Sequence, residues 1–568
     1  MMAMTIVYFD WIEYLVFGLM LAVSGFIGVY FGFIKKEGQD TVDGYLLGGK
    51  EMTLFPVAMS LIASFISGIA LLGIPSEVYR YGMNYLFVTL SYPTAGLVCS
   101  YVFLPVFFKL QQISVYQYME LRFNKFVRKM ISFLFTISQI GLVPIVIYGP
   151  ALALSQVSDY GVFTISFYLS AFCLFYTSIG GLKAVVWTDT VQGVVMYGAI
   201  FTIATLGTMK VGGISKILTT NYHGGRFDLI WDIDPRIRAS VWSMTVGFMI
   251  TNTATSAIHP SFVQRFISLR TVREARWSSL IFMSGSFIFA IFNMYMGLIV
   301  FTHFEKCDPL ATGVIEKPDQ ILSYFIIHVF RDVRGLAGVF FAGLVSAALS
   351  TMSALLNTLA ATVYEDFIEP ITGKVSDSKA ARMLKIITVA FGILCFLLVL
   401  VMEKLGSLLE LYNSFSGPCA GVILGIFFLG VFFPQVNSKG AALGGIISLV
   451  AMCVLVYGSR MAVANGDLVY PMLPVSVEEC TYNFTLVSNS TFAPTPVLDK
   501  VNPIFEITVY YYCLIGCVLA MILGIIISYL TGPNKLDQVD RDLLSPLVLR
   551  FLPKYTPVPV KETEMIKM

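Results

Sequence analysis

Six hydroxyl side chains and one amide stand in the apolar stretch SAALSTMSALLNTLAAT, residues 346–362. On a helix, residues three and four apart share a face, so Ala347, Ser350 and Thr351 would present one carbonyl and two hydroxyls to one place. Sodium is a hard cation that prefers oxygen ligands, and a set of neutral oxygens can bind it and release it. The alternative is that these hydroxyls donate to carbonyls one turn back in their own helix, as Ser and Thr in membrane helices readily do.

The composition indicates that this stretch belongs to a membrane protein. Of the 568 residues, 57% are hydrophobic and 13% are charged, against about 25% charged in an average soluble domain. A net charge of +2 excludes a basic surface for nucleic acid. Because a spanning helix needs about 20 apolar residues, the sequence predicts an all-α polytopic protein with about 13 transmembrane helices. The candidate spans lie near 11–33, 54–78, 85–108, 131–155, 161–180, 189–210, 240–262, 276–302, 335–362, 383–402, 409–433, 439–457 and 508–530.

The charges at the ends of the spans predict the orientation. Lys and Arg are enriched in cytoplasmic loops, and here they gather after the first, third and seventh spans. This places the N-terminus outside and the C-terminus in the cytoplasm. Two glycosylation sequons, at Asn483 and Asn489, fall in the loop 458–507, which the same rule places outside. We therefore expect a multi-pass glycoprotein of the plasma membrane.

Two of the nine cysteines lie outside the expected spans. Cys307 and Cys480 both fall in loops assigned to the exterior, which is an oxidising compartment, so we expect them to form a disulfide with each other. The alternative is two unrelated free thiols.

Two expected spans combine polar residues with helix breakers. The second span carries Ser64, Ser67, Gly68 and Pro75, and the seventh carries Asn252, Ser256, His259 and Pro260. Interruptions at matching positions of two halves indicate a midplane site in proteins with inverted repeats. An unwound second span would offer the carbonyls of Ala63 and Ile66 to the hydroxyls of 346–362. The alternative is close helix packing through small residues.

This spacing predicts two five-helix repeats and divides the chain into five parts. These are 1–33 with the N-terminus and first helix, the repeats 54–210 and 240–433, two extra helices in 439–530, and the tail 531–568.

Nine segments, which together cover roughly residues 10–535, resemble the sodium/solute symporter family in sequence and in order. The family contains the sodium-glucose cotransporters, and the branch to which the chain is most similar contains monocarboxylate, multivitamin and iodide carriers. The segments are SLIASFISGIALLGIPSEVYRYG, ELRFNKFVR, VIYGPALALSQV, GGLKAVVWTDTVQ, DIDPRIR, VQRFISLRT, CDP, PDQ and LSTMSALLNTLAATVYEDFIEP.

The resemblance implies the leucine-transporter type fold and specific roles for several residues. The implied sodium site consists of Ala63, Ile66, Ala347, Ser350 and Thr351, the residues that the spacing indicates. Asp189 is similar to a carboxylate on the cytoplasmic sodium exit path, although an Asp at that place could also cap a helix. Asn357 either supports a second sodium position or bonds across helices.

The same resemblance limits the class of solute that we expect the chain to carry. Sugar carriers have a polar Asn where Phe65 stands and a His where Ala70 stands, so a hexose is disfavoured; iodide carriers have a Gln in place of Ala70. The expected pocket is lined by Ser64, Phe65, Ser67, Tyr148, Asn252, Ser256 and His259. Because half-helix N-termini bind carboxylates, we expect a small organic anion such as lactate, pyruvate, a short-chain fatty acid, pantothenate or biotin. His259 either donates to that anion or fills space beside Pro260.

Three functions follow from these features. The first is sodium-coupled symport of a small organic anion, with sodium ions, that anion and the bilayer as partners. The second is sodium-coupled carriage of another solute, such as iodide, inositol or choline. The third is a solute-gated channel or sensor on the same scaffold. An enzyme is not expected, because the sequence has no HExxH, GxSxG or P-loop motif, and no cofactor beyond the coupling Na⁺ is expected.

Overall fold

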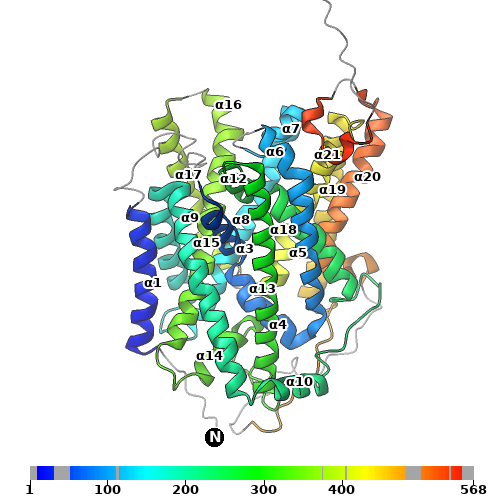
Figure 1. Cartoon of the computed structure of the whole chain (residues 1–568). Coiled ribbons are helices and arrows are strands. Elements are labelled where there is room, and N and C mark those ends of the chain that lie inside the picture. Colours follow the sequence, from blue (N-terminus) through cyan, green and yellow to red (C-terminus); the bar gives the residue numbers. More distant parts are fainter. Residues whose placement is uncertain are drawn as a thin grey trace, which may run out of the picture.

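The fold is a bundle of long helices that run roughly parallel to one axis (Figure 1). The computed structural model describes residues 9–30, 52–110, 114–373, 375–402, 406–480, 501–536 and 539–552. Its main helices are α1 (Trp11–Val29), α3 (Leu54–Phe65), α4 (Gly68–Tyr81), α5 (Ser91–Val98), α6 (Leu104–Leu110), α8 (Lys125–Ser155), α9 (Val162–Lys210), α11 (Phe248–Thr253), α12 (Pro260–Ile267), α13 (Val272–Phe304), α15 (Leu336–Val363), α17 (Asp377–Met402), α18 (Leu408–Phe432), α19 (Ser438–Ala464) and α20 (Tyr512–Leu530). The shorter elements are η3 (Met83–Leu90), η4 (Cys99–Phe103), α7 (Gln117–Arg122), α10 (Ile214–His223), η5 (Ser243–Gly247), η6 (Ala254–Ile258), η7 (Pro318–Gln320), α14 (Ile321–Val329), η8 (Tyr364–Ile368), α16 (Glu369–Thr372), η9 (Pro503–Glu506), η10 (Val509–Tyr511), η12 (Arg541–Leu543) and α21 (Pro546–Leu549).

The helical content confirms the expected fold class. In the described part of the chain, 10 helices are long and apolar enough to cross a membrane, or 11 when the bent pair α3–α4 counts as one span. The remaining expected spans, near 161–180 and 240–262, are present in different forms. The first is joined to its successor in α9, and the second is divided among η5, α11, η6 and α12.

Helix α9 contains two of the expected spans as limbs that lie side by side. Its 49 residues would make a straight helix of about 74 Å, more than twice the bilayer core. Gly28 of α1 packs against Tyr176, while Ser24, one turn earlier, accepts a hydrogen bond from Gln192 (3.1 Å). A straight helix would separate Tyr176 from Gln192 by about 24 Å. The chain therefore reverses within α9.

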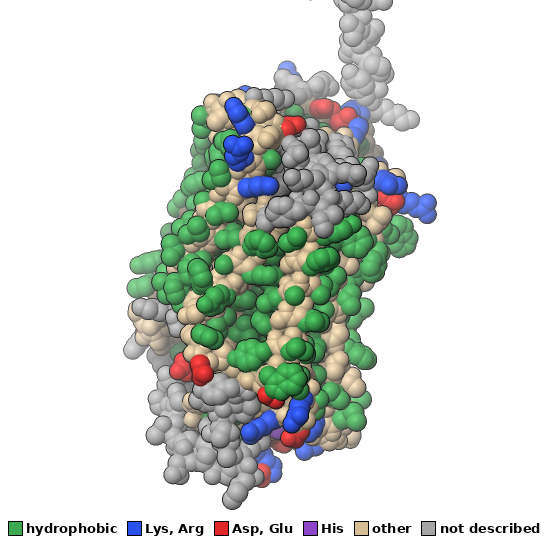
Figure 2. Space-filling model, turned by 90° about the vertical axis from the view of Figure 1, so that its left-hand side faces the viewer, with side chains coloured by type: hydrophobic (Ala, Val, Ile, Leu, Met, Phe, Trp, Pro, Cys, Tyr) green, Lys and Arg blue, Asp and Glu red, His purple; other side chains and the backbone are tan. Residues whose placement is uncertain are grey.

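The outer surface fits a bilayer. Hydrophobic side chains cover the middle of the face shown in Figure 2, and the Lys, Arg, Asp and Glu side chains that are visible lie above and below them. Apart from α1, helices α17 and α20 are the most exposed spans, because only 28% and 33% of their most apolar windows are buried. In α15, by contrast, 94% of the corresponding window is buried. Helix α15 thus forms the centre of the bundle, and its hydroxyls face other helices rather than lipid.

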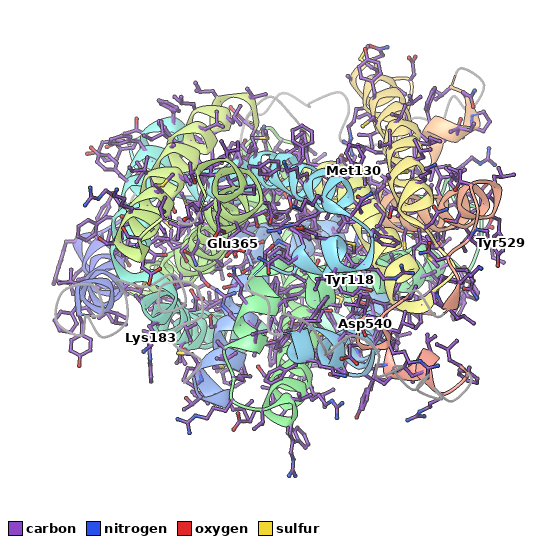
Figure 3. All side chains as sticks on the ribbon, turned by 90° about the horizontal axis from the view of Figure 1, so that it is seen from above. Tyr118, Met130, Lys183, Glu365, Tyr529 and Asp540 are labelled. Carbon is purple, nitrogen blue, oxygen red and sulfur yellow. A yellow bond between two sulfur atoms is a disulfide. The ribbon has the colours of Figure 1, made fainter. Side chains whose placement is uncertain are left out.

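The two ends of the bundle carry different elements. Helices α7, α16 and α21 lie at one end, here called the α16 end, and α10 and α14 lie at the other, here called the α10 end (Figure 1). Seen from the α16 end, Glu365 of η8 lies toward the middle of the molecule and Tyr529 of α20 at its edge (Figure 3). At the α10 end, Cys307 is joined by a disulfide to Cys480, with Cα atoms 5.1 Å apart.

Candidate ion and substrate site

Two helix breaks face each other inside the bundle. Helix α3 ends at Phe65, Ile66 and Ser67 are extended, and α4 begins at Gly68 at an angle of 55° to α3. The last N–H of the α3 ladder belongs to Ile66 and donates to the carbonyl of Ile62. The carbonyls that follow, from Ala63 onward, therefore lose their partners within the helix. The break expected in the second span is thus present at its expected place.

Oxygens of the α3 break and of α15 meet, as the spacing of 346–362 predicts. The Thr351 hydroxyl lies 3.0 Å from the Ser64 carbonyl and 2.9 Å from the Ala347 carbonyl, to either of which it can donate. The Ser350 hydroxyl lies 3.2 Å from that of Ser64. Thr351 can therefore bond back within its own helix, as the alternative interpretation predicts, and also across to α3. A cation between the helices would meet hydroxyl and carbonyl oxygens from both sides.

Next to this cluster, side chains from three helices meet at one buried carboxylate. Asp189 in the second limb of α9 is 0% exposed, and its Oδ2 accepts hydrogen bonds from Ser60 (2.7 Å) and Ser64 (3.0 Å) of α3. Arg265 of α12 pairs with the same Oδ2 at 3.0 Å. The other oxygen, Oδ1, is buried without a hydrogen-bond partner in the described part of the chain. Because Ser64 contacts both Asp189 and Ser350, the carboxylate and the neutral oxygens form one network.

Two expectations about this network need correction. Asp189 does not cap a helix, because the second limb of α9 is already helical from Lys183 onward, six residues before Asp189. Arg265 is not a loop residue that follows the seventh span; it lies within α12 and is 1% exposed. The sequence could have indicated its burial, because Arg265 follows the break at His259 by less than two helical turns, and a helix that continues inward carries it into the bundle.

The neighbouring cavity has a volume of about 160 Å³ and lies between the two breaks. Of the expected pocket residues, Ser64, Phe65, Ser67, Asn252 and His259 line it, together with Thr351 of the ion cluster. Aromatic rings form much of the wall, and Phe65 packs edge-on against Tyr92, Phe262 and Phe282. The lining contains no Lys, Arg, Asp or Glu among the described residues. Sequence reasoning missed the polar lining residues Ser138, Gln139, Thr251, Thr255, Tyr412, Asn413 and Ser416.

Tyr148 and Ser256 do not line this cavity, contrary to expectation. The ring of Tyr148 faces the ammonium of Lys317 at 5.3 Å, so it points to the loop before α14. The carbonyl of Ser256 accepts from the thiol of Cys99, which shows that this part of η6 faces η4. Both residues lie on the far faces of helices that contribute other residues to the cavity.

His259 occupies the second break in a defined way. It is extended, it precedes Pro260 at the start of α12, and its Nδ1 accepts a hydrogen bond from the Ser261 N–H at 3.2 Å. Its ring also packs edge-on against Phe135 and Phe262. The residue is therefore the N-cap of α12 as well as a cavity residue.

Ion pairs flank the cavity toward both ends of the bundle. Toward the α10 end, Arg238 pairs with Glu77 of α4 at 2.8 Å and also with Glu410 of α18. Glu77 and Glu410 lie just beyond the lining residues Ile74 and Leu409. Toward the α16 end, Arg128 pairs at 2.5 Å with Asp366 of η8.

One predicted residue of the described part of the chain lies away from this centre. Asn357 is buried in α15, about two turns beyond Ser350, and its amide oxygen has no hydrogen-bond partner in the described ranges. The sequons at Asn483 and Asn489 lie outside the described residues.

Comparisons with known proteins agree with this architecture. The model of the family described as "SSF: Sodium:solute symporter family" matches residues 45–448. The chain is 36% identical over 548 residues to sodium-coupled monocarboxylate transporter 2 from Mus musculus, covering 95% of this chain and 87% of that protein. It is also 33% identical over 560 residues to the human sodium/iodide cotransporter, covering 94% of this chain and 85% of that protein.

Among solved structures, the chain is similar to a Na⁺-coupled sialic acid symporter in its substrate-bound outward-open state. The TM-score is 0.74 at 24% identity, and the alignment covers 93% of this chain and 99% of that one. This similarity confirms the leucine-transporter type fold. The broken helices, the converging oxygens and the family match agree, and the chain belongs to the sodium:solute symporter family, whose members couple solute transport to sodium.

Proposed function

We propose that the chain imports a small monocarboxylate together with sodium across the plasma membrane. The observation that carries this proposal is the meeting of Ser64, Ser350 and Thr351 at the helix break beside an uncharged cavity. The similarity to sodium-coupled monocarboxylate transporters supports the choice of solute.

The proposed sodium ligands are the carbonyls of Ala63, Ile66 and Ala347 with the hydroxyls of Ser350 and Thr351. These neutral oxygens suit an ion that must leave in every cycle, because they bind sodium without the attraction of a full charge. Asp189, with its unpaired Oδ1, would receive a sodium ion on its exit path or hold a second one. Asn357 would support that second position.

The proposed solute is a monocarboxylate such as lactate, pyruvate or a short-chain fatty acid, or a carboxylate vitamin such as pantothenate or biotin. The cavity offers no basic side chain, so the donors for a carboxylate are the first N–H groups of α4 and the polar residues Ser67, Asn252 and His259. Phe65 and Ala70 both line the cavity. They stand where sugar carriers have Asn and His, so the cavity lacks two side chains that could bind the hydroxyls of a hexose.

The proposed orientation places the α16 end in the cytoplasm and the α10 end outside. Arg122, Arg128 and Arg276 lie toward the α16 end, which agrees with the preference of basic residues for the cytoplasmic side. The disulfide between Cys307 and Cys480 at the α10 end agrees with an oxidising exterior. Glycosylation at Asn483 or Asn489, detected as a mass shift after treatment with a glycosidase, tests this orientation.

An uptake panel tests the function. Cells that express the chain would be given radiolabelled lactate, butyrate, pantothenate, biotin, iodide or glucose, each with sodium or with choline in its place. We expect sodium-dependent uptake of at least one carboxylate and none of glucose. The double variant Ser350→Ala with Thr351→Ala should abolish this uptake at normal surface abundance, because two of the five proposed ligands are removed.

The outcomes separate the competing functions. Uptake that persists unchanged without sodium contradicts the proposal. Sodium-dependent uptake of iodide alone would favour the second candidate, which the identity to the human sodium/iodide cotransporter makes worth testing. Currents without accumulation of any solute would favour a channel or sensor.

A further inference from the structure

One amide in the cavity wall differs from the other polar lining groups. Gln139 of α8 is 3% exposed, and its Oε1 has no hydrogen-bond partner among the described residues. Asn252 donates to Ser91 at 2.6 Å, and Asn413 donates to the Leu409 carbonyl at 2.8 Å. A buried amide oxygen without a partner is costly, so a molecule inside the cavity should satisfy it.

His259 lines the same cavity as Gln139 and adds a donor. Phe135, one helical turn before Gln139 on α8, packs edge-on against the His259 ring with centroids 5.2 Å apart. Gln139 therefore lies about 6 Å further along the same face of α8. Because Nδ1 of His259 accepts from Ser261, the proton of the neutral ring is on Nε2, which is left to donate into the cavity.

The surroundings of this pair are apolar. Leu142, Phe262 and Leu355 line the same cavity, and the lining has no charged side chain in the described ranges. A matching ligand has a small apolar body and two adjacent oxygen groups. One is a carboxylate that accepts from His259 and from backbone N–H groups. The other is a hydroxyl that donates to Gln139 Oε1.

We propose that Gln139 and His259 form a subsite that reads the oxygen on carbon 2 of a short carboxylate. The cavity thereby selects 2-hydroxy acids over unsubstituted fatty acids of the same length. This inference rests on the proposed function, since it names the solute subclass of the same cavity. A site built to bond a hydroxyl discriminates strongly against the analogue that lacks it, because its own polar atoms are then left unpaired.

The test compares two acids that differ by one hydroxyl group. Sodium-dependent uptake of L-lactate and of propionate would be measured on the parent chain and on Gln139→Met, which keeps the length of the side chain and removes both polar atoms. We expect lactate uptake, as Vmax/KM, to fall about tenfold and propionate uptake to change less than about twofold. Gln139→Leu should act in the same direction.

The ratio of the two acids within one preparation cancels any loss of folded protein. Ser416→Ala serves as the matched control, because the Ser416 hydroxyl lines the cavity but donates to Tyr412 in its own helix at 2.8 Å. It should leave the lactate-to-propionate ratio unchanged. Uptake of both acids with an unaltered ratio in the Gln139 variants overturns the inference alone. A parent chain that takes up neither acid with sodium overturns the inference, and it overturns the proposed function too when no carboxylate of the uptake panel is taken up.

Discussion

At the scale of single residues, the buried pair of Asp189 and Arg265 should contribute strongly to stability. Both side chains are almost fully buried, and removal of one partner from a buried pair typically costs about 3–5 kcal/mol because the other charge stays buried. We therefore expect Asp189→Asn and Arg265→Met each to lower the thermal stability of the detergent-solubilised protein strongly. The double variant should recover much of that loss, since it removes both charges.

Transport should respond differently from stability to the same changes. The double variant has no carboxylate for a sodium ion, so its sodium-dependent uptake should stay low even where its abundance recovers. Recovery of both stability and uptake would show that the pair is structural only. A double variant as unstable as the two single losses added together would contradict the burial argument.

A second residue-scale prediction concerns Asp319 in η7, outside the spanning helices. Burial raises the pKa of this carboxyl to about 6, against the opposing effect of the Leu408 N–H that donates to it at 3.0 Å. The folded state then holds the proton more tightly than the unfolded state, so stability falls as pH rises from about 4 to 6. The shift corresponds to at most about 3 kcal/mol. Thermal unfolding of Asp319→Asn between pH 4.5 and 7 should show a weaker decline than the parent, and an equal decline would contradict the assignment.

At the scale of elements, the start of α4 depends on Gly68. A Cβ at this position would lie 3.0 Å from Pro150 of α8 and 3.3 Å from Leu344 of α15. Gly68→Ala should therefore displace the break by a few tenths of an ångström, at a cost of about 1–3 kcal/mol. Because Ser64 lies one turn earlier, we expect a higher sodium concentration for half-maximal uptake. Gly198→Ala in α9 is the control, since a Cβ there meets nothing within 4 Å, and it should leave the sodium dependence unchanged.

The sequence predicted best those elements that are determined by residues within a single segment. Gly68 and Pro260 mark the two breaks because a break needs residues that leave the helix ladder, and the apolar lengths mark the spans. The orientation of single faces was harder to predict. Tyr148 and Ser256 were expected in the cavity and point elsewhere, and Gln139 was missed although it is an amide inside an apolar span. Which face of a helix meets the cavity depends on its rotation against distant helices, which spacing within one segment does not determine.

At the scale of the whole molecule, the cavity is bounded by ion pairs toward both ends. Arg238 joins α4 to α18 on one side, and Arg128 joins α8 to η8 on the other. This arrangement suits alternating access, in which the two sides open in turn.

The number of sodium ions decides how far such a cycle can concentrate an anion. The proposed function has two cation positions, one at Ser350 and Thr351 and one at Asp189. Two sodium ions with one monoanion would carry one net positive charge inward, whereas one sodium ion would carry none. A charge that crosses about 60 mV gains about 1.4 kcal/mol, or a factor of about ten in accumulation.

In proteoliposomes with a tenfold sodium gradient, two ions per anion predict about 100-fold accumulation at zero potential and about 1000-fold at 60 mV, negative inside. One ion predicts about tenfold at either potential. We expect the voltage-dependent result, measured as steady-state uptake of the labelled acid with and without a potassium diffusion potential. Removal of Asp189 by Asp189→Asn with Arg265→Met should abolish the voltage effect in any uptake that remains. Accumulation that is independent of the potential in the parent chain would show that only one sodium ion enters with each anion.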